Sequence, residues 1–148
     1  MGSLHSREAD QNTMFVAIRG ERVDGHDYIG QAIDAGCRCF LCEYVPQDIH
    51  AKKVGAAVVE DSVAAFCKLA KNYRIEKFGQ NDPMKTVAVT GSVGKSTTKE
   101  MIAAVLSARY RVLKTPGNLN NDIGTPQVLL QLMSKHEAAV IETGMNHF

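Results

Sequence analysis

Residues 90–97, T-G-S-V-G-K-S-T, have the residue types and spacing of a loop that binds a nucleoside triphosphate. Gly91 and Gly94 allow the backbone to curl, so that successive N–H groups converge on one oxyanion. Lys95 would reach the β- and γ-phosphates, and the Ser96 hydroxyl would ligate Mg²⁺. The predicted nucleotide-binding residues are Gly91, Ser92, Val93, Gly94, Lys95, Ser96 and Thr97.

The sequence around this loop has the order that a phosphate site requires, which is strand, glycine loop and helix. Residues 86–89 are an apolar, mostly β-branched run, and a helix pattern begins at Lys95. The common form G-x-x-x-x-G-K-[ST] has a glycine where this chain has Val89, so we expect a tighter variant of the loop. The alternative is a strand-to-helix turn without a ligand, and the Lys-Ser pair directly after the glycine argues against it.

Glu142 is predicted to act in catalysis together with Lys95, and to share the metal with Ser96. It ends an apolar run, residues 139–141, that has the pattern of a buried strand. Ligands of parallel sheets bind beyond the carboxyl ends of the strands, which places Thr90, Thr115 and Glu142 on one rim. A carboxylate there can bind Mg²⁺ directly or through water. The alternative for Glu142 is a solvated residue at a strand end.

Polar residues elsewhere have two interpretations each. Asn118 and Asn120 belong either to a structural turn or to a site for a second substrate. His147 either contacts phosphate or substrate, or is a solvated side chain. The loop at residues 20–26 either contacts substrate or caps the helix that follows it.

The composition is typical of a globular α/β protein. The chain has 148 residues, of which 45% are hydrophobic and 22% charged, which is enough for one ordinary domain or two small ones. A net charge of +1 without a basic cluster argues against nucleic acid as a partner. We expect no membrane insertion, since no apolar stretch is long enough and no signal peptide is visible. The four cysteines are expected to be buried thiols in a reducing cytoplasm.

We expect a small amino-terminal α/β domain, residues 1–80, and the first part of a phosphate-loop parallel-sheet domain, residues 81–148. A polar linker with glycine and proline at residues 78–83 separates them. The expected strands are residues 15–18, 38–42, 56–59, 86–90, 111–114 and 138–142. The expected helices are residues 27–35, a helix capped by Asp61, residues 95–109 with an apolar face of Met101, Ile102, Val105 and Leu106, and residues 126–133. Strands joined by helical crossovers imply parallel sheets, and three strands are few for a complete one.

With these residues in place, the chain resembles the Mur ligase family, MurF type. Residues 90–100, T-G-S-V-G-K-S-T-T-K-E, are similar to the family's phosphate loop, including its lack of a glycine at position 89. Residues 117–126, G-N-L-N-N-D-I-G-T-P, resemble a stretch most typical of the MurF type. Residues 141–147, I-E-T-G-M-N-H, resemble the one whose glutamate binds Mg²⁺.

Ser6-Arg7 and residues 15–26, F-V-A-I-R-G-E-R-V-D-G-H, resemble the amino-terminal domain that holds the uridine nucleotide end of the substrate. Three positions depart from the family. His5 stands where aspartate is usual, Ser96 replaces a common threonine, and Thr143 replaces methionine or leucine.

The resemblance implies a cytoplasmic, ATP- and Mg²⁺-dependent ligase of peptidoglycan synthesis that adds D-alanyl-D-alanine to UDP-N-acetylmuramoyl-tripeptide. It implies substrate-binding roles for Ser6, Arg7, Asn118, Asn120 and His147. The family continues past the position of Phe148, so we expect little activity without the missing part, supplied in cis or in trans. The alternatives are a nucleotide-binding module, half of a split ligase completed by another chain, or an inactive fragment that binds a uridine nucleotide.

Overall fold

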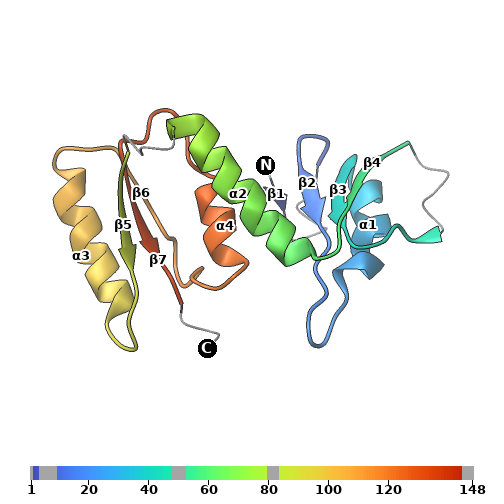
Figure 1. Cartoon of the computed structure of the whole chain (residues 1–148), viewed down its shortest axis with the longest axis horizontal. Coiled ribbons are helices and arrows are strands. Elements are labelled where there is room, and N and C mark those ends of the chain that lie inside the picture. The colour runs from blue at the N-terminus through green and yellow to red at the C-terminus, as the bar shows by residue number, and fades with distance from the viewer. Residues whose placement is uncertain (1, 4–9, 48–52, 80–83, 145–148) are drawn as a thin grey trace. The chain divides into compact units, whose positions relative to one another are not determined.

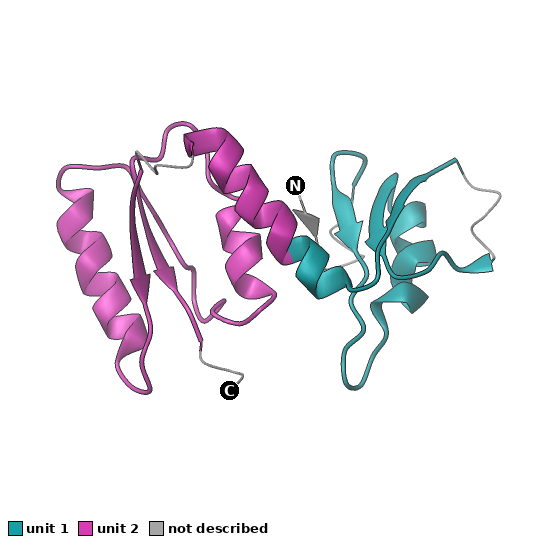
Figure 2. Ribbon diagram, viewed as in Figure 1, with its two compact units in different colours: residues 1–66 teal, residues 67–148 magenta. Residues whose placement is uncertain are grey.

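The computed structural model describes residues 2–3, 10–47, 53–79 and 84–144, in two compact units, residues 1–66 and 67–148 (Figure 2). Each unit contains a parallel sheet with helices, which confirms the predicted α/β class. The predicted boundary at residues 80/81 puts helix α2, Ser62–Phe78, wholly in the first domain, whereas the division into units falls within this helix. That the first domain binds a UDP-sugar and the second ATP stays a prediction.

The first unit carries a four-stranded sheet in the order β1-β2-β3-β4 (Figure 1). Its elements are β1 (Gly2–Ser3), β2 (Met14–Val16), the 3₁₀ turn η2 (Gly25–Tyr28), α1 (Ile29–Asp34), β3 (Cys39–Cys42) and β4 (Gly55–Val58). The predicted helix at residues 27–35 is therefore only partly correct. Its start is a 3₁₀ turn, because the Asp24 carbonyl accepts a hydrogen bond from the Asp27 N–H in the i→i+3 manner. Gly36, at φ +109°, ends the helical segment as predicted.

The core of the first unit lies between its sheet and α1. Phe15 of β2 and Phe40 of β3 pack edge to face, with ring centroids 6.3 Å apart. Ile29 and Ile33 reach the same cluster from α1. The expectation for the cysteines was wrong in part: Cys37 and Cys42 are buried, but Cys39 and Cys67 are exposed.

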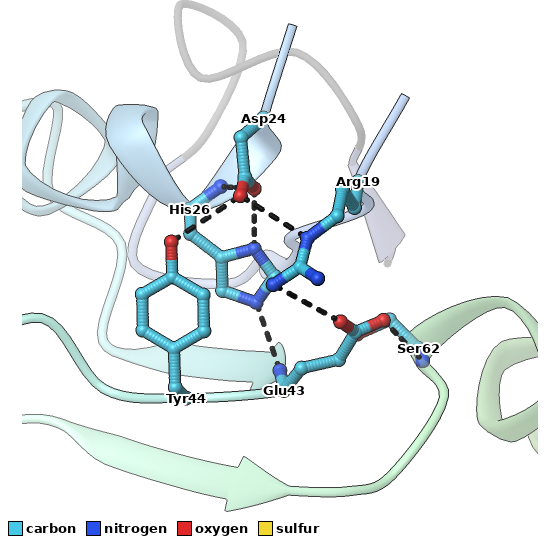
Figure 3. Close-up of polar contacts among 6 residues, drawn as sticks. All are labelled: Arg19, Asp24, His26, Glu43, Tyr44 and Ser62. Carbon is cyan, nitrogen blue, oxygen red and sulfur yellow. Dashed lines mark hydrogen bonds and ion pairs between the residues drawn. The ribbon is translucent and has the colours of Figure 1, made fainter. Parts of the chain in front are cut away.

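His26 is buried and ties the loop before α1 to the end of β3 (Figure 3). Its Nδ1 lies 2.6 Å from Asp24 Oδ1, and its Nε2 accepts a hydrogen bond from the Glu43 backbone N–H at 2.8 Å. Its ring stacks on Tyr44, with centroids 4.2 Å apart. Arg19 pairs with Asp24 at 3.4 Å and with Glu43 at 3.7 Å. The polar residues of this loop thus have a structural role, and the Asp24 side chain caps the 3₁₀ turn.

The Asp24 carboxylate should make the stability of this unit depend on acid pH. The hydrogen bond from the His26 backbone N–H, above all, holds the pKa of Asp24 at about 2. Since the unfolded value is about 3.9, the ionised group stabilises the fold above that pH, and the contribution is lost as the pH falls through about 2. We expect Asp24→Ala to lower the free energy of unfolding at pH 6 by about 1 kcal/mol, measured by urea unfolding followed by circular dichroism.

The difference in unfolding free energy between wild type and Asp24→Ala should become smaller as the pH falls from 4 to 2. Asp27→Ala is the matched control, because Asp27 is an exposed acid of the same turn. It should change the unfolding free energy by less than about 0.5 kcal/mol at either pH. An equal pH response of the two variants would contradict the role assigned to Asp24.

The second unit carries a three-stranded sheet in the order β5-β7-β6, with α3 and α4 on opposite faces (Figure 1). Besides the part of α2 from Cys67 on, its elements are β5 (Lys85–Val89), α3 (Lys95–Ser107), β6 (Val112–Lys114), α4 (Gly124–Leu129) and β7 (Ala138–Glu142). Every residue of the central strand β7 is buried. Its side chains alternate: Ala139 and Ile141 pack in the cluster of α4, and Val140 packs in the cluster of α3.

The face of α3 that covers the sheet differs from the prediction. Ile102 and Leu106 pack on the sheet as expected, together with Ala103. Met101 and Val105 are 65% and 74% exposed. The covered stripe includes residues 99, 102, 103 and 106, which is the i, i+3, i+4, i+7 spacing of one helix face. This stripe therefore places Lys99 in the interior.

Candidate nucleotide and metal site

The loop between β5 and α3 has the backbone of an anion cradle. Gly91 has φ +142° and Gly94 has φ +76°, conformations that favour glycine. Gly94 is the residue before Lys95, the first of α3, so the unpaired N–H groups of that helix lie at the loop. Lys95 Nζ donates a hydrogen bond to the Gly91 carbonyl at 2.7 Å, which holds the ammonium group at the loop. This geometry suits the β- and γ-phosphates of a nucleotide.

The Glu142 carboxylate is buried at the carboxyl end of β7 and receives three donors. Ser96 Oγ lies 3.1 Å from Oε2 and 3.3 Å from Oε1. Asn120 Nδ2 donates to Oε1 at 2.7 Å, and Lys99 Nζ lies 3.4 Å from Oε2. The Glu142 N–H donates to Thr115 Oγ1 at 2.9 Å, which fixes the strand end on the rim predicted for Thr115 and Glu142.

These contacts keep Glu142 ionised. Burial alone would raise the pKa of Glu142, but the hydrogen bonds from Asn120 and Ser96 and the nearby Lys99 ammonium outweigh it. The pKa of Glu142 therefore lies below the ordinary value of a glutamate. An ionised carboxylate beside a hydroxyl is the form that a divalent cation needs.

The donor set fits Mg²⁺. The ion prefers oxygen ligands in octahedral geometry at about 2.1 Å, so adjacent ligands lie about 3.0 Å apart. The Ser96 and Glu142 oxygens are 3.1 and 3.3 Å apart. Mg²⁺ is commonly held by one or two carboxylates plus substrate phosphates, so Ser96, Glu142 and a nucleotide would suffice. Among the described residues, no group of three or more His, Cys, Asp or Glu forms another metal site.

The asparagine loop, residues 117–122, reaches this site through Asn120. The Asn120 carbonyl also accepts a hydrogen bond from the Gly144 N–H at 2.5 Å, and Asn121 Oδ1 accepts one from the Gly124 N–H at 2.7 Å. A cavity of about 270 Å³ opens beside the loop, lined by Asn120, Asp122, Thr125, Leu129, Thr143 and Gly144 among others. Asn118 is exposed on the loop.

Gly124 should be needed for this loop to close. A Cβ on Gly124 would lie 2.7 Å from the Leu119 carbonyl carbon and 2.8 Å from its Cα. We expect Gly124→Ala to lower the free energy of unfolding by about 2 kcal/mol, because the loop must shift. Gly30→Ala is the matched control: Gly30 lies in α1 with nothing within 4 Å of a Cβ. Thermal unfolding of both variants measures the effect, and Gly30→Ala should be neutral or slightly stabilising. A Gly124→Ala variant as stable as Gly30→Ala would refute the close packing.

The structure brings together Ser96, Glu142 and Asn120 of the residues predicted from the sequence, with Lys95 at the adjacent loop. Three of the predicted substrate residues, Ser6, Arg7 and His147, lie outside the described residues. Lys99 was missed. Its spacing from Ile102 and Leu106 puts Lys99 on the same face of the helix. A pattern of apolar residues alone does not include a lysine, so the sequence analysis did not single it out.

Comparison with known proteins identifies the family that this chain resembles. Residues 89–148 match the Mur ligase middle domain. Over 99% of its length, the chain matches the crystal structure of MurF from Acinetobacter baumannii, with a TM-score of 0.87 and 40% identity. The chain belongs to the Mur ligase family. The MurF ligase of Thermotoga maritima in complex with ADP also matches 99% of this chain, with a TM-score of 0.82 and 36% identity.

The Mur ligase relatives are longer than this chain. The UDP-N-acetylmuramoyl-tripeptide–D-alanyl-D-alanine ligase of Bacillus subtilis is 40% identical over 144 residues, which are 95% of this chain and 30% of that protein. The chain covers 30% of the Acinetobacter structure and 32% of the Thermotoga structure. It thus spans about 30% of the length of the relatives that it matches. No helix among residues 2–3, 10–47, 53–79 and 84–144 is both long and apolar enough to cross a membrane.

Proposed function

We propose that this chain supplies the phosphate- and metal-binding part of an ATP-dependent ligase that adds D-alanyl-D-alanine to UDP-N-acetylmuramoyl-tripeptide in the cytoplasm. The observation that carries the proposal is the contact between Ser96 Oγ, directly after the glycine loop, and the buried Glu142 carboxylate on the central strand. That pair places a hydroxyl and an ionised acid next to a phosphate cradle. The MurF relatives support the choice of substrates.

In this mechanism the terminal carboxylate of the peptide attacks the γ-phosphorus of ATP. An acyl phosphate forms and ADP leaves. The amine of D-alanyl-D-alanine then attacks the acyl carbon, phosphate leaves, and the amine loses a proton. Lys95 and the loop N–H groups stabilise the negative charge of the transferring phosphoryl group. Bound Mg²⁺ would neutralise charge on the phosphate oxygens, with Ser96 and Glu142 as its protein ligands.

Asn120 has a positioning role in this proposal. Its side chain holds Glu142 Oε1, and its backbone carbonyl holds Gly144. The predicted substrate contacts of Ser6, Arg7, Asn118, Asn120 and His147 belong to the same proposal and rest on the resemblance of their motifs.

Calorimetry with two ligands tests the proposal. The chain is titrated separately with Mg-ADP and with a UDP-sugar. Binding of Mg-ADP that is weakened in Lys95→Ala is the expected result. Binding of the UDP-sugar alone, with no heat from Mg-ADP at millimolar concentration, would instead favour a protein that only binds a uridine nucleotide.

A further inference from the structure

Lys99 is a buried cation that neither the phosphate cradle nor the proposed chemistry accounts for. Its side chain is 2% exposed, yet it lies on a helix face that otherwise packs apolar residues on the sheet. A buried ammonium is retained in a fold only when it is paired and hydrogen-bonded. Lys99 Nζ meets this condition with Glu142 Oε2 at 3.4 Å and the Gly117 carbonyl at 2.9 Å.

The other charges near Lys99 do not replace Glu142 as its partner. Glu100 Oε1 lies 3.7 Å from Lys99 Nζ, but the Glu100 side chain is 51% exposed and also pairs with Lys114. Its field is therefore screened by solvent. Glu142, at 1% exposure, is the buried counter-charge. The two charges cancel, so the interior of the site is close to neutral before any ligand binds.

We propose that Lys99 is an internal counter-cation that positions Glu142 and prevents it from taking up a free divalent cation, so that the metal enters together with the nucleotide phosphates. This inference rests on the proposed function. A divalent ion arriving alone meets the Lys99 charge at Glu142 Oε2 and also has to displace the hydrogen bonds from Ser96 and Asn120. An ion that arrives on a nucleotide brings phosphate charges that offset this repulsion.

The bond from Lys99 to Gly117 adds a second consequence. It joins α3, which carries the phosphate loop, to the start of the asparagine loop, whose Asn120 holds the other Glu142 oxygen. Lys99 is thus a positioning residue that fixes both sides of the metal ligand and touches no reacting atom.

The test measures binding of Mn²⁺ alone to the chain by electron paramagnetic resonance, without nucleotide. Mn²⁺ is the probe because it takes the same oxygen ligands as Mg²⁺. Lys99→Gln removes the charge and keeps a donor for Gly117, and Lys99→Met is a second neutral variant. Lys99→Arg keeps the charge and is the matched control. Thermal unfolding followed by circular dichroism shows which variants fold.

Both neutral variants should bind free Mn²⁺ about tenfold more tightly than wild type, while Lys99→Arg should bind it as weakly as wild type. A gain of affinity is not expected from a residue whose role is only structural. Neutral variants that bind Mn²⁺ no better than wild type would overturn the inference.

The proposed function is tested by a separate arm of the same experiment. ADP is added to the wild-type chain, and Mn²⁺ affinity is measured again. Failure of ADP to recruit Mn²⁺ would contradict nucleotide binding at this site. A change of free-Mn²⁺ affinity in the neutral variants reports on Lys99 alone, so the two failures are distinguishable.

Discussion

Lys95→Ala is expected to lower the affinity of the chain for Mg-ADP about 10- to 100-fold. The ammonium group lies against the Gly91 carbonyl, at the loop where the phosphates would bind. A charge-assisted hydrogen bond to phosphate contributes about 1.5–3 kcal/mol, which corresponds to this range. Titration of a fluorescent ADP analogue measures the loss.

The fold should be unaffected by this substitution, because Lys95 is only half-buried and its observed partner is a loop carbonyl. Lys135→Ala is the matched control. Lys135 is exposed and precedes β7, so it lies near the amino-terminal ends of the parallel strands, whereas the phosphate loop lies at their carboxyl ends. The Lys135→Ala variant should bind the analogue as tightly as wild type does. Equal affinities of the Lys95→Ala and Lys135→Ala variants would contradict the role of Lys95 in binding phosphate.

Glu142→Gln is expected to cost about 3 kcal/mol of unfolding free energy and to abolish the effect of Mg²⁺ on ADP affinity. The amide keeps the size of the side chain but leaves Lys99 buried without its counter-charge. It also removes the charged ligand of the metal. Urea unfolding and ADP titration with and without Mg²⁺ measure the two effects.

Two companion variants separate charge from packing. Glu137→Gln alters an exposed acid just before β7 and should cost less than about 1 kcal/mol. The double variant Glu142→Gln/Lys99→Met should recover much of the lost stability, because it removes both buried charges. A double variant as unstable as the sum of the two single ones would show that the pair does not interact.

Glu142 should also make stability depend on acid pH. Its pKa in the fold is lowered, so its ionised form stabilises the protein above the unfolded value of about 4.3. That contribution is lost as the pH falls through the lowered folded value. Glu142→Gln should therefore show a weaker loss of stability below pH 4 than wild type in the same urea experiment.

The strands from β2 onward, and the glycine loop between β5 and α3, could be predicted because their signals are local. An apolar run followed by G-S-V-G-K-S needs only neighbouring residues to define a strand, a turn and a helix start. The placement of Thr115 and Glu142 on one rim followed from the rule that the carboxyl ends of parallel strands lie on the same side of a sheet. The hydrogen bond between the two residues confirms this placement.

The parts that could not be predicted depend on contacts between distant residues. Lys99 and Glu142 are 43 positions apart, and their pairing requires the order β5-β7-β6, in which β7 lies at the centre of the sheet. The sheet also decides which face of α3 is covered, so the apolar residues Met101 and Val105 lie exposed and only Ile102 and Leu106 of the predicted apolar positions pack on the sheet. The 3₁₀ turn before α1 depends on Asp24, whose carboxylate contacts His26, Arg19 and Tyr44. These contacts could not be read from the sequence.

The central claim is that phosphate and metal bind between the glycine loop and the end of β7. Titration of the ¹⁵N-labelled chain with Mg-ADP, followed by amide chemical shifts, tests it directly. The account predicts that the largest shifts occur at residues 91–97 and at Glu142, and that Lys95→Ala reduces them. Shifts confined to other residues, or none at millimolar Mg-ADP, would contradict it.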